Sequence, residues 1–445
     1  MPLSLSEFLV VMGLAALMAL ECCLAIRSRS WVQIYRPTLF IAVILAFYAL
    51  VGPIRAVLSA GEAANFVGTS GTIYRELEHR PFLLWGWVGA LVFYASVLAG
   101  FYLLPCKMQP KYLINGLGLN RIRAWGLLLC WIGIGMYALV HGPHLFVLLN
   151  PLAPQSADVS WFGFSGLDVG PFHNYFLLSI NLLIPGIVLQ FAVWLRQRKN
   201  LWVVLAWFVV ASLIYLSEAF RYRILLLLIP MLLLWFFYNK RRPMLVAMLI
   251  FMVSFLSFNG LVGVARTHLR GLDLDQAAGY TPQQLIKASF EEAGVFFTTS
   301  AVIQAVPNRF PFIGFEPIAT TLVHPIPRQI YPGKPAGNYS KRYTDPIYDL
   351  NHFTGVAILG YAEYYLMFGW FSVVTASFIV GVLLRRLWTW FLWRQYEPLA
   401  QSIYLLNASY LYVVVSRGYL PQIVMLYAFS ILPLFCIYWG LSKSR

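Results

Sequence analysis

The sequence predicts an all-α membrane protein that crosses the bilayer about eleven times and carries one large, partly helical loop on its outer side. Composition, recurring apolar runs and the distribution of lysine and arginine support this prediction. Of the 445 residues, 60% are hydrophobic and 11% are charged, whereas soluble domains carry about a quarter charged residues. The lipid bilayer is therefore the expected solvent for most of the chain.

Apolar runs recur from one end of the sequence to the other. A helix needs about 20 mostly apolar residues to cross the hydrocarbon core, because its backbone polar groups must be satisfied internally. Runs near this length lie close to residues 8–26, 37–58, 82–104, 124–142, 174–195, 201–217, 224–238, 243–263, 354–384, 399–415 and 423–441. The first run is expected to be retained as a helix, since Met1 to Glu7 lacks the basic residues of a signal peptide.

These runs divide the chain into three parts. Residues 1–263 hold the first eight predicted helices, 264–353 form the large outer loop, and 354–445 hold the last three helices. Loops on the cytoplasmic side of a membrane protein are enriched in lysine and arginine. One set of alternate loops contains 18 of the 32 basic residues: Arg27, Arg29, Arg36, Lys107, Lys111, Arg121, Arg123, Arg196, Arg198, Lys199, Lys240, Arg241, Arg242, Arg385, Arg386, Arg394, Lys443 and Arg445. This alternation predicts a periplasmic N-terminus and a cytoplasmic C-terminus.

The formal net charge of +15 does not predict nucleic-acid binding. The basic residues of the predicted cytoplasmic loops are explained by the positive-inside rule and by contact with anionic lipid headgroups. All five cysteines lie in predicted helices or at a helix end, so neither a disulfide framework nor a cysteine metal site is expected. The sequence also lacks a Gly-rich nucleotide loop, an HExxH motif and a DxD-like acidic cluster. We therefore expect no cofactor and no metal.

The large outer loop carries two local patterns. Thr281 and Pro282 suit the N-cap and first position of a helix, which predicts a helix over residues 282–305. The stretch 307–346 contains eight prolines, which favours an irregular wall, neither helix nor strand, packed over the helices as a lid.

Two very short outer turns carry arginine, where the charge rule disfavours it. The first joins two apolar runs and contains Glu218, Arg221 and Arg223, and the second contains Arg417. The planar guanidinium group matches phosphate oxygens, so these side chains are candidates for binding an anionic group. The alternatives are contact with lipid headgroups, or an ion pair between Glu218 and Arg221.

Further candidates flank the long loop. Arg266 and Arg270 are four residues apart and share a helix face, where a solvated helix end is the alternative. Arg328 and Lys334 lie on a proline-rich stretch, which lowers the entropy cost of holding a cation toward a ligand.

A titratable pair lies where the ninth run begins. His352, preceded by Asn351, is a candidate general base or anion-binding donor at the outer start of this run. Glu363 follows about three turns deeper, where a helix-to-helix hydrogen bond is the alternative role.

The arginine turns, the proline-rich stretch 325–335 and the Asn351–Gly355 segment together resemble Wzy-type oligosaccharide repeat-unit polymerases, a family that includes the O-antigen and enterobacterial common antigen polymerases. This resemblance implies a metal-independent glycosyltransferase with a GT-C-like architecture in the bacterial inner membrane, acting in lipopolysaccharide biosynthesis. Its donor would be a glycan on undecaprenyl pyrophosphate, and its acceptor a second lipid-linked repeat unit. By position, Arg221, Arg266, Arg328 and Arg417 match the anion-binding arginines of the family and His352 heads its outer helix; at Arg223 the family accepts other polar residues.

The expected mechanism is a single inverting displacement. The arginines bind the donor pyrophosphate, and His352 or Glu218 removes the proton from the attacking hydroxyl group. An O-antigen ligase that transfers the glycan to lipid A core is the main alternative, and a polysaccharide transporter or flippase is a weaker one. The expected partners are undecaprenyl-pyrophosphate-linked oligosaccharides and membrane lipids, with the chain-length regulator and flippase of the same pathway as further candidates.

Overall fold

The fold is helical throughout the part of the chain that the structure describes. The computed structural model describes residues 3–28, 30–53, 83–103, 118–142, 144–150, 169–218, 221–240, 254, 257–258, 260–262, 279, 281, 290–335, 338–348 and 357–443. Of these residues, 82% are helical and none lies in a strand. The prediction of an all-α membrane protein is confirmed at this level.

Six helices in the described ranges are long and apolar enough to cross a membrane. They are α1 (Leu5–Arg27), α5 (Leu83–Leu103), α6 (Leu119–His141), the continuous run Gly170–Gln197, α19 (Trp370–Trp393) and α20 (Pro398–Ser416). The run Gly170–Gln197 consists of η6 (Gly170–Phe172), α8 (His173–Leu178), η7 (Ser179–Leu182) and α9 (Leu183–Gln197). A seventh crossing results if α21 (Leu420–Ser430) and α22 (Leu432–Lys443), which meet at a 42° bend, act as one.

Three further apolar helices are shorter. They are α2 (Pro37–Leu45) with its π-helical continuation η2 (Ala46–Val51), α10 (Leu201–Ser217) and α11 (Arg221–Tyr238). They lie on the second, sixth and seventh predicted runs, whereas most of the eighth run, 243–263, lies outside the described residues. The number eleven therefore stays a prediction. Two small elements, η1 (Trp31–Tyr35) and α7 (His144–Leu148), join longer helices.

The ninth predicted run, 354–384, is wrong as a single helix. Its described part forms a short helix, α18 (Gly360–Phe368), and then α19, with Gly369 between them at φ 66°. This positive φ favours glycine, and the Gly369 N–H donates to the Tyr365 carbonyl at 2.8 Å, which ends α18. α19 starts at Trp370 and extends to Trp393, so Arg385 and Arg386 lie on the helix instead of in the predicted loop.

The large loop contains more helix than its prolines suggested. Its first helical part, η8 (Glu291–Gly294) and α15 (Val295–Ala305), fits the end of the predicted helix 282–305, while 282–289 lie outside the described residues. The prediction of no helix within 307–346 is wrong, since α16 (Glu316–Val323) and most of α17 (Lys341–Tyr348) lie there. Pro317 occupies the first turn of α16, where a helix needs no N–H partner, so this proline is compatible with the start of a helix.

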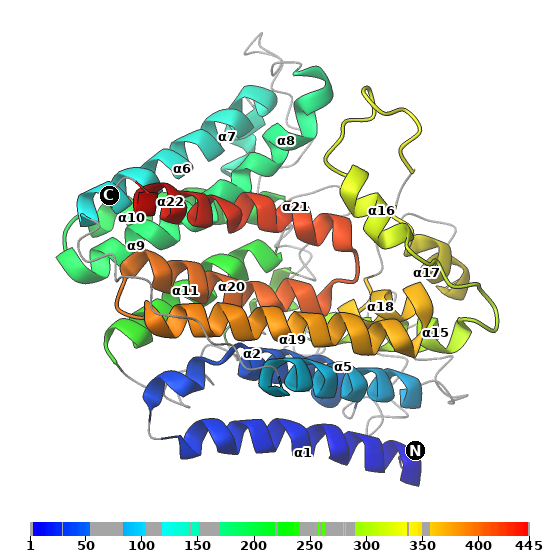
Figure 1. The fold of residues 1–445 in the computed structure, drawn as a ribbon. Coiled ribbons are helices and arrows are strands. Elements are labelled where there is room, and N and C mark those ends of the chain that lie inside the picture. The colour runs from blue at the N-terminus through cyan, green and yellow to red at the C-terminus, as the bar shows by residue number, and fades with distance from the viewer. Residues whose placement is uncertain are drawn as a thin grey trace.

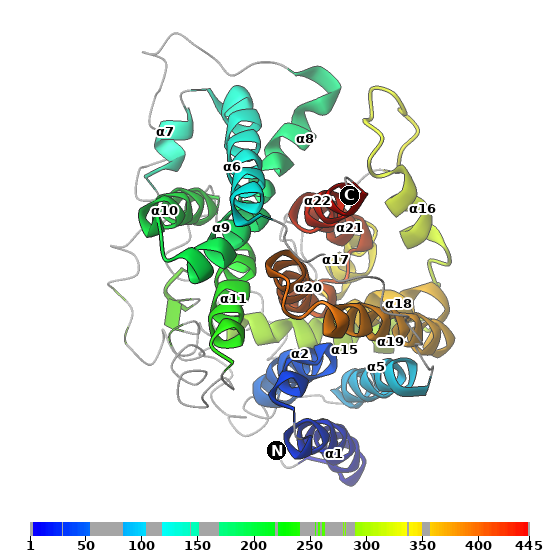
Figure 2. The ribbon, with the colours of Figure 1, turned by 60° about the vertical axis from the view of Figure 1, so that its left-hand side comes forward.

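Small residues let the longest helices approach closely. α5 lies along α19, and a Cβ atom on Gly100 or Gly381 would collide with a backbone carbonyl of the facing helix. α6 and α9 meet through Gly126 and Gly186 in the same way. Without a hydrophobic driving force between helices in lipid, such contacts depend on close packing, for which glycine is suited. Figures 1 and 2 show the resulting bundle, with α16 and α17 at one end of it.

The described ends of the chain lie at opposite ends of the bundle, and α16, α17 and α18 share the end at which α1 begins (Figure 1).

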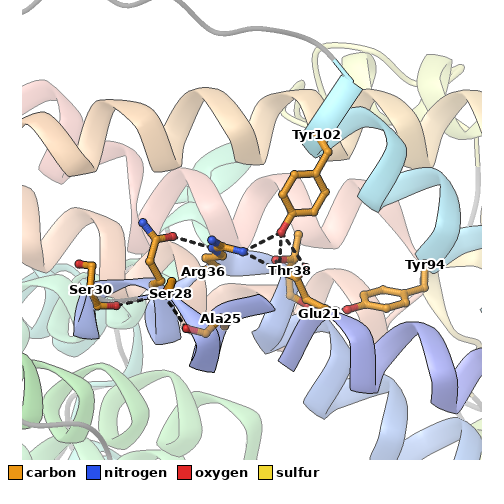
Figure 3. Close-up of polar contacts among 9 residues, drawn as sticks. Glu21, Ala25, Ser28, Ser30, Arg36, Thr38, Tyr94 and Tyr102 are labelled. Carbon is orange, nitrogen blue, oxygen red and sulfur yellow. Dashed lines mark hydrogen bonds and ion pairs between the residues drawn. The ribbon is translucent and has the colours of Figure 1, made fainter. Parts of the chain in front are cut away.

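Away from that end, the carboxylate of Glu21 links α1 to α2 and α5 through hydrogen bonds (Figure 3). It accepts hydrogen bonds from Thr38 Oγ1 at 2.5 Å and from the Tyr102 hydroxyl at 2.6 Å, and it lies 3.7 Å from Arg36. A buried carboxylate needs such partners to offset its desolvation.

Candidate anion-binding site

A cavity of about 490 Å³ opens among α8, α16 and α21. Its walls come from three distant parts of the chain: residues 170–178, residues 320–335, and Tyr419 with Met425. We call it the basic cavity. Its volume is within the range of about 300–1,000 Å³ that is typical of small-molecule sites.

Two cations give the basic cavity its charge. Arg328 and Lys334 both line it, and none of the described residues that line it is an aspartate or glutamate. Arg328 donates to the Pro335 carbonyl at 2.9 Å, and the Lys334 ammonium donates to the carbonyls of His324 and Ile326. These bonds to the backbone fix both side chains without neutralising them. The predicted role of Arg328 and Lys334 in binding an anion stays a prediction.

The two cations also influence the titratable groups around them. Burial, together with the charge of Arg328, lowers the pKa of Lys334. Burial, together with the charge of Lys334, lowers the pKa of His324, so this imidazole is neutral at pH 7. Burial is the larger cause of both shifts, and the neighbouring cation adds to each, as expected where two basic side chains lie close together.

Thr320 contributes a hydroxyl group to the cavity wall. Its side chain is 3% exposed, and its hydroxyl has no hydrogen-bond partner among the described residues. A buried hydroxyl without a partner costs about 1–3 kcal/mol, so a ligand atom that hydrogen-bonded to this group would offset that cost. His173 and Asn174, on the opposite wall, offer further donors. The cavity thus combines cations and hydrogen-bond donors, as recognition of a phosphate-like group requires.

Glu363 does not line the cavity but hydrogen-bonds to segments next to two of its walls. It is buried on α18, accepts the backbone N–H of Leu420 at 2.7 Å, and also accepts a hydrogen bond from the Tyr339 hydroxyl. The rings of Tyr339 and Tyr419 lie 5.1 Å apart. Glu363 therefore holds the start of α21 against the segment that follows the 328–335 loop, and this places Tyr419 in the cavity wall.

Arg417 lies next to this wall but does not line the cavity. One of its terminal nitrogens lies 3.3 Å from Glu292, beside a hydrogen bond between the hydroxyls of Tyr48 and Tyr412. Burial lowers the pKa of Arg417, but Glu292 and the nearby tyrosines raise it above its ordinary value, so the side chain stays charged. The N–H of Gly418 donates to the Ile358 carbonyl at 2.7 Å, which fixes the turn beside the start of α18.

The other predicted residues are not brought together with the cavity in the described structure. Glu218 accepts a hydrogen bond from Tyr137 at 3.1 Å and lies 4.0 Å from His141, both on α6. Figure 2 shows its helix, α10, and α16 on opposite sides of the bundle. Arg223 is buried, with its guanidinium group 5.9 Å from the ring centres of Tyr215 and Tyr222.

Several predicted residues cannot be assigned to this geometry. Only the backbone of Arg221 is described, at the start of α11. The side chains and backbone of Arg266, Arg270, Asn351 and His352 lie outside the described residues. Their predicted roles stay predictions.

Sequence reasoning missed most of the hydrogen-bond donors of the cavity. Thr320 and His324 are four residues apart on one helix, opposite the exposed Phe315 and Leu322. Two polar residues opposite two apolar residues at helical spacing indicate a two-faced helix, and this pattern was present in the sequence. His173 and Asn174 gave no signal, because only the fold brings them to residues 320–335.

The chain matches no protein-family model, no curated protein and no solved structure. The function is therefore inferred from the site and from the sequence.

Proposed function

We propose that this chain is a membrane glycosyltransferase that polymerises oligosaccharide repeat units carried on undecaprenyl pyrophosphate. The basic cavity carries this proposal, because it joins two cations that have no acidic neighbour in its described lining with a buried hydroxyl that has no partner among the described residues, at one end of an apolar helix bundle. A pyrophosphate on a lipid carries several negative charges at the membrane surface, where such a cavity would meet it. The sequence resemblance to Wzy-type polymerases points to the same substrate.

The proposed reaction forms one glycosidic bond and breaks one bond to phosphate. A hydroxyl oxygen of the acceptor unit attacks the anomeric carbon of the donor glycan, the bond to the pyrophosphate oxygen breaks, and undecaprenyl pyrophosphate leaves. Arg328 and Lys334 stabilise the negative charge that develops on the leaving oxygen, which is the largest electrostatic demand of the step. The proton of the hydroxyl passes to a general base, for which His352 remains our candidate.

Of the two predicted bases, Glu218 fits this scheme less well. Its contacts are with α6, on the other side of the bundle from α16. Arg417 fits as a second anion contact close to Tyr419, because its guanidinium group has five N–H donors and the Glu292 contact involves one terminal nitrogen. Arg221, Arg223, Arg266 and Arg270 remain proposed contributors from the sequence.

We further propose that the basic cavity faces the periplasm from the bacterial inner membrane, with the N-terminus periplasmic and the C-terminus cytoplasmic. The helix ends at Arg27, Arg196 and Arg394 lie away from the end that holds α16. The positive-inside rule assigns such basic ends to the cytoplasm.

Deletion and complementation of the gene in its host test the proposal. A polymerase-deficient strain retains single repeat units on its surface glycan and loses the ladder of longer chains. Complementation with Arg328→Ala or Lys334→Ala should leave the ladder absent, whereas Arg309→Ala, which removes an exposed arginine of the same loop outside the cavity, should restore it. Loss of every repeat unit from lipid A core would instead indicate a ligase, and normal ladders in both cavity variants would contradict the proposed site.

A further inference from the structure

α16 has two chemically different faces, and the apolar one points outward. Phe315, the N-cap residue of the helix, is 68% exposed, Ile318 is 41% exposed and Leu322 is 73% exposed. These three residues share one face at the spacing i, i+3, i+7. Thr320 and His324 lie on the opposite face, toward the basic cavity. A helix of a water-exposed loop normally has the reverse arrangement.

The polar groups of α16 outside the cavity face are already satisfied. Glu316 forms an ion pair with Arg342 at the start of α17. The Thr321 hydroxyl donates to the Pro317 carbonyl at 2.7 Å, which satisfies it within the helix. The outward face therefore presents no unsatisfied polar side chain that would be penalised by an apolar environment.

The outward face continues the exposed apolar surface of a candidate membrane span. The ring of Phe315 contacts that of Phe368 at 4.7 Å, and Phe371, at the start of α19, is 75% exposed. Val374, Ile379 and Leu383 are further exposed apolar residues along α19. A single apolar surface thus runs from the span through α18 onto α16.

Backbone hydrogen bonds fix α16 in this position. The N–H groups of Ile313 and Gly314 donate to the carbonyls of Leu366 and Met367 at 2.9 and 3.1 Å. These carbonyls belong to the last turn of α18, where a helix leaves its C=O groups without internal partners. α16 therefore begins directly at the junction between α18 and the span α19.

We infer that α16 lies in the membrane interface, with Phe315, Ile318 and Leu322 among the lipid acyl chains and its Thr320–His324 face toward the basic cavity. The partner of this surface is the lipid bilayer, because the surface continues that of α19 without a polar boundary. The basic cavity is then held at the depth of the lipid headgroups, where a phosphate-bearing amphiphile can reach it from within the membrane. The inference concerns where α16 lies, and it does not depend on the proposed glycosyltransferase function.

Collision measurements on a spin-labelled full-length chain test this inference. Nitroxide labels would be attached to Ile318→Cys and, separately, to Leu322→Cys, after replacement of Cys22, Cys23, Cys106, Cys130 and Cys436, in nanodiscs of phosphatidylethanolamine and phosphatidylglycerol. Molecular oxygen concentrates in acyl chains, whereas a water-soluble nickel chelate does not. Phe371→Cys, on α19, is the control expected to face lipid, and Asn308→Cys, at an exposed position next to Arg309, is the control expected to face water.

The expected result is that labels at 318 and 322 collide with oxygen more than with the nickel chelate, as the label at 371 does. Preferential collision with the chelate, as at 308, would show an aqueous face and overturn the inference. Protection from both reagents would show a protein partner, and would overturn it as well. Two label sites keep the test decisive if one label disturbs local packing, and neither outcome depends on glycan synthesis.

Discussion

Tyr339 donates a hydrogen bond from its hydroxyl to the buried carboxylate of Glu363. The same carboxylate accepts the N–H of Leu420 at 2.7 Å. One donor follows the 328–335 loop and the other lies beside Tyr419 at the start of α21, so one carboxylate on the short helix α18 links the segments next to two walls of the basic cavity. α18 is too short to cross a bilayer, and this contact lies outside the candidate spans.

Glu363 should make stability depend on pH. Burial raises its pKa from 4.5 to about 7, and the hydrogen bonds from Tyr339 and Leu420 oppose this only in part. The folded state therefore binds this proton more tightly than the unfolded state does. Its contribution is fully present below pH 4.5 and is lost as pH rises through 7, a loss on the order of 3 kcal/mol.

Thermal unfolding of the detergent-solubilised protein at pH 5 and pH 8 measures this effect. The wild type should lose more stability between the two values than Glu363→Gln, which cannot ionise. An equal loss in both proteins would show that Glu363 is not the group responsible.

Thr320→Val should separate stability from activity. Valine has nearly the same shape and removes a buried hydroxyl that has no partner among the described residues. We expect the variant to be as stable as the wild type or more stable, by about 1 kcal/mol. If the hydroxyl binds the substrate, elongation should fall by about tenfold, the equivalent of one hydrogen bond of 1.4 kcal/mol. Unchanged elongation would remove Thr320 from the site.

The ion pair between Arg417 and Glu292 can be tested by a double-mutant cycle. Arg417→Gln and Glu292→Gln should each lower stability, and the double variant should lose less than the sum, by about 1–2 kcal/mol. The double variant should still lack the glycan ladder, because we assign Arg417 to anion binding as well. A double variant with a normal ladder would restrict Arg417 to a structural role.

Glu21 should matter for stability and not for the reaction. Glu21→Ala removes the acceptor shared by Thr38 and Tyr102 (Figure 3), none of which lines the basic cavity, and it should cost about 3 kcal/mol. Glu21→Gln, which keeps a hydrogen-bond acceptor, should cost less. Denaturant titration measures both values, and a loss of stability in Glu21→Gln equal to that in Glu21→Ala would show that the charge, and not the hydrogen bonds, is required.

The sequence predicted the helices well where length and hydropathy decide them. It failed at Gly369, because a sum of hydropathy values carries no information about a residue with positive φ in the middle of an apolar run. It also failed at α16, where prolines suggested irregular structure and one of them instead occupies the first turn of the helix. Local backbone geometry, and not composition, decides such positions.

The candidate site was predictable in part. Arg328 and Lys334 were recognisable because cations on a proline-stiffened stretch are unusual, and they do line one cavity. The pairing of Arg417 with Glu292 was not predictable, because 125 residues separate them and no local pattern joins the two. The wall formed by residues 170–178 was missed for the same reason.

Polymerisation by the purified chain tests the central claim most directly. The protein in nanodiscs would be given synthetic repeat units on undecaprenyl pyrophosphate, with a chelator present, and the products would be separated by size. We predict lipid-linked products of two and more repeat units with the wild type and with Arg309→Ala, and none with Arg328→Ala. Absence of elongation by the folded wild-type protein, or transfer of the glycan only when lipid A core is added, would contradict the account.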